Sequence, residues 1–277
     1  ENEKNISDAF HMAQREALAA FGNGELYIEK YIPEMRHIEV QILADNKGSV
    51  VHLGERDCSI QRRHQKLIEE SPYIFSNKVF RKKIGELAVK AARAMRYRNA
   101  GTVEFIVDNE ENIYFMEINT RIQVEHPVTE MITGIDIIKE QIQLAAGEPL
   151  SFRQQDIKFS GHSMECRINA EDPDKFTPCP GKITSFIPPG GPGVRVDTSG
   201  YSGWLVPAHY DSLIAKLITH GKDREEAIMR MRRALKEFII EGIKTTIPFY
   251  QRILDEPDFL SGNFTTHFLE KLNSSPE

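Results

Sequence analysis

The chain has 277 residues, of which 40% are hydrophobic, so it can bury a sizeable core and is expected to fold. Its net charge of −6 argues against a nucleic-acid-binding protein, because such proteins usually present a clustered basic surface to the phosphates. Three widely separated cysteines favour neither a disulfide framework nor a zinc site, and no apolar run is long enough to span a membrane, so we expect a reducing compartment, the cytoplasm or, in a eukaryote, the mitochondrial matrix.

The first 53 residues predict one helix and three strands. Apolar residues recur at helical spacing over residues 7–21, where Ser7 is the expected N-cap and Gly22 the stop. The sequence Asp45-Asn46-Lys47-Gly48 has strong turn chemistry and should join two strands into a hairpin. The expected strands cover residues 25–31, 36–44 and 49–53.

The rest of the chain mixes helices with strands, which indicates an α+β fold. The expected elements are helices at 77–95, 135–146 and 223–239 and strands at 102–107 and 113–118. Gly147 should end the second of these helices. After Pro149, short strands and Pro/Gly-rich stretches indicate a second, β-rich unit, and we place the boundary near residues 150–160.

The run from Glu117 to Glu125 alternates strictly between polar and apolar residues. If it is extended, its polar side chains share one face of a strand and its apolar side chains anchor the other face. Such alternation more often marks a solvated face, but two carboxylates, two amides and a guanidinium favour a face that binds ligands of opposite sign. These polar residues are Glu117, Asn119, Arg121, Gln123 and Glu125. Pro127 is expected to end the strand and to start a loop.

The preceding hairpin predicts a pair of carboxylates. A turn centred between Glu110 and Glu111 would place Glu104 directly opposite Glu117, and like charges so placed, with Cβ atoms about 5 Å apart, destabilise a sheet. A divalent cation such as Mg²⁺ would offset this repulsion, and Asn119 could add a third oxygen. The register is assumed, since a slip by one residue would put the two carboxylates on opposite faces.

Three sequence blocks resemble one known family. The blocks are residues 55–66 (ERDCSIQRRHQK), 116–130 (MEINTRIQVEHPVTE) and 165–172 (ECRINAED). Together they resemble the signature of the biotin carboxylases, ATP-grasp enzymes that carboxylate biotin at the expense of ATP. The resemblance implies an antiparallel ATP-grasp sheet with helices over residues 1–155, of which 1–31 would be the remainder of a lid subdomain. A β-rich C-terminal domain is then expected over residues 156–277.

The resemblance also implies roles for individual residues. Glu104, Glu117 and Asn119 would hold Mg²⁺ or Mn²⁺ against the nucleotide phosphates. Glu125 would be the general base toward bicarbonate, and Arg167 would contact both bicarbonate and the ureido oxygen of biotin. The implied bicarbonate residues are Lys66, Arg121, Gln123, Val124, Glu125 and Arg167. The implied ATP-binding residues are Glu29, Lys30, Ile32, His37, Gln61, His64, Glu104 and Glu117.

Partners and alternatives follow from the same resemblance. A biotin carboxyl carrier, a carboxyltransferase component and a second copy of the chain are the implied partners, with neither nucleic acid nor membrane among them. The family's amino-terminal domain and glycine-rich loop have no counterpart in these residues, so we expect weak activity from them alone. Two other hypotheses are a different ATP-grasp ligase, such as a relative of carbamoyl-phosphate synthetase, and a non-catalytic scaffold. The scaffold should have lost site residues, and none is lost.

Overall fold

A computed structural model describes residues 5–274 and divides between Pro33 and Glu34 into two compact units. In the first unit, α1 (Ile6–Phe21) ends at Gly22, which adopts a left-handed φ of 70° and donates its N–H to the Leu18 carbonyl, as predicted. The predicted N-cap is wrong, because Ser7 lies inside the helix and Asn5 precedes it. The strand predicted at 25–31 is also wrong: the segment pairs with no described strand, and a strand needs hydrogen bonds to a neighbour.

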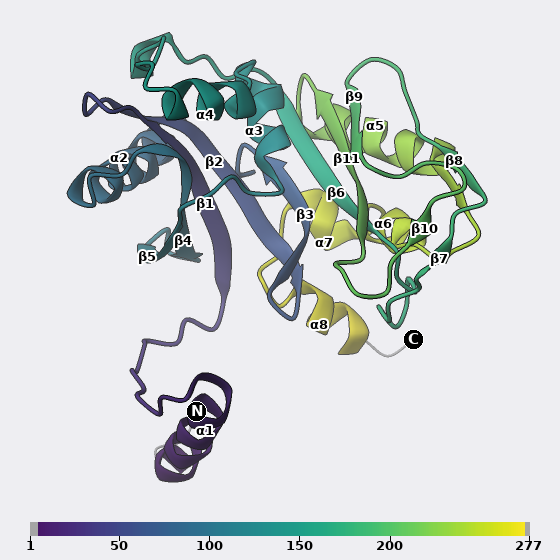
Figure 1. The fold of residues 1–277 in the computed structure, drawn as a ribbon, viewed down its shortest axis with the longest axis horizontal. Helices are drawn as coiled ribbons and strands as arrows, with labels where there is room; N and C mark the ends of the chain where they lie inside the picture. Colours follow the sequence, from purple (N-terminus) through teal and green to yellow (C-terminus); the bar gives the residue numbers. More distant parts are fainter. Residues whose placement is uncertain (1–4, 275–277) are drawn as a thin grey trace. The chain divides into compact units, whose positions relative to one another are not determined.

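The second unit is built on one eight-stranded sheet in which every neighbouring pair is antiparallel (Figure 1). Across the sheet the order is β5-β4-β1-β2-β3-β6-β11-β9. The strands are β1 (Met35–Ala44), β2 (Val50–Arg62), β3 (Gln65–Ser71), β4 (Asn99–Asp108), β5 (Ile113–Asn119), β6 (His162–Asn169), β9 (Val194–Thr198) and β11 (Leu213–Gly221). Strands β3 and β6 lie on opposite sides of the predicted domain boundary at 155/156 and pair with each other, so the sheet continues across that boundary. The boundary itself stays a prediction.

The sequence predicts the β1–β2 hairpin but not the β2–β3 hairpin that follows it. The β1–β2 turn forms as predicted, since the Asp45 carboxylate accepts hydrogen bonds from the backbone N–H groups of Lys47 and Ser49. Strand β2 continues nine residues beyond the predicted end, to Arg62. The added part includes Glu55, Arg56 and Asp57, which are buried against charged partners elsewhere in the fold, so hydrophobicity does not reveal them. A two-residue turn at Arg63 and His64, both with positive φ, leads into β3.

At the start of three helices, the side chain of the residue just before the helix accepts hydrogen bonds from the first backbone N–H groups. Asn77 accepts from the N–H groups of Val79 and Phe80 at the start of α2 (Lys78–Ala94). Asp136 caps α4 (Ile137–Ala145) and Asp223 caps α5 (Arg224–Glu237), close to the predicted bounds. The remaining helices are α3 (His126–Thr133), α6 (Ile247–Ile253), α7 (Pro257–Ser261), α8 (Phe268–Ser274) and the 3₁₀ helix η2 (Gln154–Asp156).

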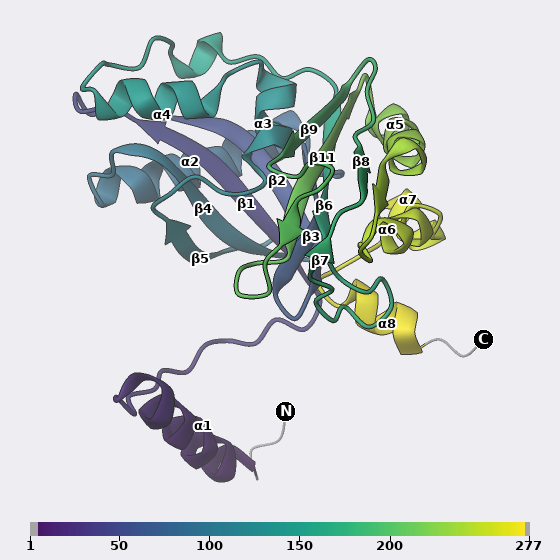
Figure 2. The ribbon, with the colours of Figure 1, turned by 45° about the vertical axis from the view of Figure 1, so that its right-hand side comes forward.

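Strand alternation sends apolar side chains to both faces of the sheet. Ile38 and Ile42 of β1 pack with Ile84 of α2, whereas Leu43 packs with Ile137 of α4. Figure 2 shows α2 and α4 on the two sides of this part of the sheet. A third core joins β6 and β11 to α5–α8. Short strands flank it: β7 (Gly181–Lys182) with β10 (Leu205–Val206), and β8 (Ser185–Ile187) with β12 (Ile239–Glu241).

Among the described residues, no helix is long and apolar enough to cross a membrane.

Candidate active site

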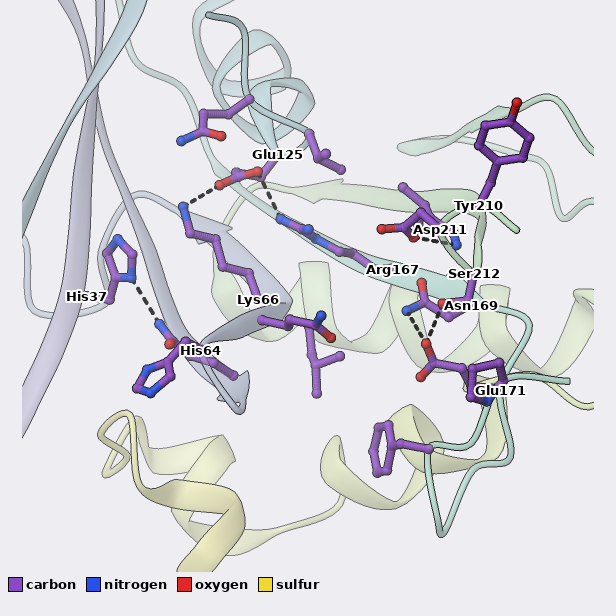
Figure 3. A pocket seen from close by; sticks show the side chains of 18 of the residues that line it. His37, His64, Lys66, Glu125, Arg167, Asn169, Glu171, Tyr210, Asp211 and Ser212 are labelled. Atoms are coloured by element: carbon purple, nitrogen blue, oxygen red, sulfur yellow. Dashed lines mark hydrogen bonds and ion pairs between the residues drawn. The ribbon is translucent and has the colours of Figure 1, made fainter. Parts of the chain in front are cut away.

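A cavity of about 760 Å³ opens within the second unit (Figure 3). It is lined by strand residues from the sheet, by the loop that follows β5, and by the segment leading into β11. Its volume is in the range of small-molecule sites. All twelve predicted site residues of this unit line it: His37, Gln61, His64, Lys66, Glu104, Glu117, Asn119, Arg121, Gln123, Val124, Glu125 and Arg167.

A row of charged side chains crosses the sheet at one level. The register sets Glu117 of β5 opposite Glu104 of β4, Glu104 opposite Glu39 of β1, and Glu39 opposite Arg56 of β2. Because paired residues of antiparallel strands share a face, all four side chains project to the same side. The predicted register of Glu104 with Glu117 is therefore confirmed, although a bulge follows it between Glu104 and Phe105.

Lys66 of β3 gathers three carboxylates of this cluster. Its Nζ donates to Glu39 Oε2 at 2.6 Å, to Glu104 Oε1 at 3.0 Å and to Glu125 Oε1 at 2.7 Å. Burial would lower the pKa of Lys66, but the surrounding carboxylates outweigh burial and raise it, so the ammonium stays charged. Glu39 is completely buried, and burial alone would raise its pKa. The charges of Arg56 and Lys66 lower that pKa instead.

The pair Glu104 and Glu117 fits a divalent cation by its chemistry. Asn119 Nδ2 lies between them and donates to both carboxylates at 3.0 Å, so an electropositive group already offsets their repulsion. Two carboxylates and an amide oxygen are the hard ligands that Mg²⁺ and Mn²⁺ accept. Glu117 is exposed, whereas the Glu104 side chain is 5% exposed, which would give an ion one buried and one open ligand.

The predicted strand from Glu117 to Glu125 is wrong beyond Asn119. Strand β5 ends there, and residues 120–125 form a bent loop that leads directly into α3. Pro127 lies in the first turn of α3 and does not start a loop, because proline's fixed φ and missing N–H suit that position. The ligand-binding side chains still reach the cavity, but a loop and a helix start place them there.

The loop links the two halves of the candidate site. Gln123 Nε2 donates to Glu104 Oε1 at 2.8 Å, and Gln123 Oε1 accepts from the exposed Arg121 at 2.7 Å. The Val124 carbonyl accepts from Lys216 of β11 at 2.9 Å. The predicted carboxylate pair and the predicted anion pocket are thus joined through one amide side chain.

Arg167 of β6 completes the charged centre. Its Nη2 donates to Glu125 Oε2 at 2.9 Å, and its Nε donates to Glu69 Oε1 at 2.6 Å. Glu125 therefore has Lys66 on one oxygen and Arg167 on the other, and Figure 3 shows this carboxylate between the two cations. A buried carboxylate held by two cations can accept a proton from an acidic substrate that the same cations attract.

Two of the predicted nucleotide residues touch each other at the cavity wall. Gln61 Nε2 lies 2.9 Å from His37 Nδ1, and His37 Nε2 lies 2.8 Å from Glu104 Oε2, close enough for an ion pair when the ring is protonated. Burial would raise the pKa of Glu104, but His37 and Lys66 together lower it to about 2. His64 is exposed at the β2–β3 turn.

The predicted adenine contacts lie in the first unit. Glu29 and Lys30 are exposed and Ile32 is partly buried, all in a segment without helix or strand. Their assignment stays a prediction.

Several residues of the charged centre were missed from the sequence. Glu39 and Arg56 form the buried end of the row of charged side chains. Glu69 binds Arg167, and Lys216 binds a backbone carbonyl of the loop. The far end of the cavity is lined by Asn169, Glu171, Asp211 and Ser212. The sequence could have identified Glu39, because it is an acidic residue between the apolar residues Ile38 and Val40. Arg56, Asn169 and Glu171 lie within the sequence blocks 55–66 and 165–172, but no residue spacing marks them as site residues.

Comparison with known proteins gives matches over both parts of the chain. Residues 1–153 match the ATP-binding domain of the carbamoyl-phosphate synthase L chain, and residues 165–271 match the biotin carboxylase C-terminal domain. Biotin carboxylase 1 of Bacillus subtilis is 59% identical over 97% of this chain. The second match and this relative speak against the carbamoyl-phosphate synthetase alternative.

Solved structures agree. A biotin carboxylase–β,γ-ATP complex from Campylobacter jejuni has a TM-score of 0.94 and 52% identity, covering 98% of this chain and 60% of that one. The biotin carboxylase domain dimer of Hydrogenobacter thermophilus 2-oxoglutarate carboxylase, in complex with MgADP, ADP and bicarbonate, has a TM-score of 0.94 and 51% identity, covering 100% and 62%. The chain spans about 60% of the length of the curated relative from Bacillus subtilis.

Proposed function

Because the chain belongs to the biotin carboxylase family of ATP-grasp ligases, we propose that the protein carrying it uses ATP and bicarbonate to carboxylate biotin on a carrier. The observation that supports this most directly is the position of Glu125, buried between Lys66 and Arg167 on the wall of the cavity. A base between two cations suits the deprotonation of an anion.

Glu125 acts on bicarbonate in the first step. Lys66, Arg121 and Arg167 attract the anion and favour its doubly charged form, while Glu125 takes the hydroxyl proton. The freed oxygen attacks the γ-phosphorus of ATP, the bond to the β-phosphate oxygen breaks, and carboxyphosphate and ADP form. Gln123 keeps Arg121 oriented through their 2.7 Å hydrogen bond.

Glu104, Glu117 and Asn119 would hold Mg²⁺ or Mn²⁺ beside this reaction. When bound, the ion would neutralise charge on the phosphates of the nucleotide. His37, Gln61 and His64 line the cavity and are proposed to contact the nucleotide, and Glu29, Lys30 and Ile32 are the proposed adenine contacts.

Arg167 serves the second step. Carboxyphosphate breaks down to CO₂ and phosphate, and the phosphate takes the N1 proton of biotin. The ureido oxygen then carries negative charge, which the Arg167 guanidinium stabilises as an oxyanion hole would. Nucleophilic N1 adds to CO₂ to give carboxybiotin.

The test is ATP cleavage that depends on bicarbonate and is stimulated by free biotin, measured in the complete protein. Glu125→Gln should reduce bicarbonate-dependent cleavage by about 10²–10⁴-fold, the usual contribution of a general base. Arg167→Ala should remove mainly the biotin stimulation. Undiminished biotin-dependent turnover in both variants would refute these roles.

The remaining assignments belong to the same proposal. The carrier and a carboxyltransferase component are the partners, the protein is a homodimer, and it works in the cytoplasm or a mitochondrial matrix. Residues 1–155 and 156–277 are its two domains in this region, and we expect these 277 residues alone to have weak activity or none.

A further inference from the structure

Two glutamates behind Arg167 face each other inside the sheet. Glu69 of β3 is directly opposite Glu165 of β6, and both side chains are completely buried. Directly opposed residues of antiparallel strands have Cβ atoms about 5 Å apart. Neither glutamate lines the cavity, so neither meets the substrates of the proposed reaction.

The two carboxyls differ in their partners. Glu69 Oε1 accepts from Arg167 Nε at 2.6 Å, whereas Glu69 Oε2 has no hydrogen-bond partner in residues 5–274. Both oxygens of Glu165 likewise lack a partner in that range. An ionised carboxylate buried without hydrogen bonds is strongly unfavourable, while a protonated one is far less so.

The neighbouring charges favour one negative charge for the pair. Lys66 and Arg167 on β3 and β6, Lys216 on β11 and Glu125 before α3 act electrostatically on the pair. The helix α3, which packs on β3 and β6, carries His126 and Glu130. Lys66 and Arg167 are already engaged by Glu39, Glu104 and Glu125, so little positive charge is left for a second ionised carboxylate. Burial raises the pKa of Glu69 to about 7 and that of Glu165 well above its usual value, and among the described residues no cation is hydrogen-bonded to either Glu165 oxygen.

We propose that Glu69 and Glu165 hold one proton between them, that Glu165 carries it, and that ionised Glu69 is the positioning residue that fixes Arg167 by its Nε. This inference rests on the proposed function. When Glu125 accepts a proton from bicarbonate, its attraction for Arg167 weakens. Glu69 then keeps the guanidinium in place for the biotin step, and Glu165 limits the negative charge behind it.

Reciprocal amide substitutions test the proposal, because glutamine mimics a protonated carboxyl in size and charge. Glu165→Gln should keep biotin-stimulated turnover within about twofold of wild type. Glu69→Gln should lower its kcat by about tenfold, the difference between a charge-assisted and a neutral hydrogen bond, and leave the KM for ATP unchanged. Loss in Glu165→Gln with retention in Glu69→Gln would place the proton on Glu69 and overturn the proposal.

Infrared spectroscopy supplies a readout that does not need turnover. The complete protein at neutral pH should show the carbonyl stretch of a buried protonated carboxylic acid, absent in Glu165→Gln. Persistence of that band in Glu165→Gln, or its absence from wild type, would contradict the inference. If biotin stimulates no turnover in wild type, the proposed function fails, and the band still decides the protonation of the pair.

Discussion

Lys66 and Glu125, 59 positions apart in the chain, form a 2.7 Å ion pair on the wall of the cavity. The pair brings β3 to the start of α3, and through Lys66 it also connects to Glu39 and Glu104. Removing one member of such a buried network leaves uncompensated charge, so function and stability should depend on it together.

Lys66→Met should therefore be costly. Three carboxylates would lose their common cation, and we expect unfolding free energy to fall by about 3–5 kcal/mol, with bicarbonate-dependent ATP cleavage near background. Chemical denaturation and the cleavage assay measure the two effects. The matched control is Lys90→Met on the exposed side of α2, which should change neither. If Lys66→Met and Lys90→Met had equal stability and equal cleavage activity, the proposed role of the Lys66 ion-pair network would be wrong.

Glu117→Gln should weaken metal binding without destabilising the fold. The carboxylate is exposed and opposes Glu104, so its removal should leave metal-free stability unchanged or raised by about 0.5 kcal/mol. Affinity for Mn²⁺ in the presence of nucleotide should fall by about tenfold or more. Titration of Mn²⁺ by its electron paramagnetic resonance signal measures this. Glu110→Gln in the preceding turn is the control, and an equal loss there would contradict the ligand assignment.

The stability of the protein in acid should depend on Glu70, which follows Glu69 in β3 and therefore points to the opposite face of the strand. Burial would raise its pKa, but Arg224 and His162 lower it to about 2. A lowered pKa means that the contribution to stability is complete above the unfolded-state value near 4.5 and is lost as pH falls toward 2. Glu70→Gln should thus destabilise the protein by about 3 kcal/mol at pH 7, and the difference should shrink below pH 4. A pH-independent difference in denaturation midpoints would contradict this.

Local patterns in the sequence predicted local structure well. The turn at Asp45, the helix starts near Asn77 and Asp223 and the register of Glu104 with Glu117 each depend on a few neighbouring residues. The same local logic failed at residues 120–125, because strict alternation also fits a loop whose apolar side chains are anchored. It failed at 25–31 because alternation does not supply a partner strand.

The long-range part of the site needed more than spacing. Lys66 and Arg167 reach Glu125 from β3 and β6, and only the family motifs brought these residues together before the structure did. The buried charges of β2 and β3 remained hidden because their partners lie on other strands: Arg56 of β2 pairs with Glu39 of β1, and Glu69 of β3 pairs with Arg167 of β6. Such pairs leave no apolar pattern along either strand.

The most direct test of the central claim, that Glu125 activates bicarbonate to attack ATP, is to follow oxygen from ¹⁸O-labelled bicarbonate during turnover with biotin. If bicarbonate oxygen attacks the γ-phosphorus, the phosphate released by the complete protein carries one ¹⁸O atom, and Glu125→Gln yields labelled phosphate at a rate lower by about 10²-fold or more. Phosphate without label would mean that water attacks ATP, and the account of the site would be wrong.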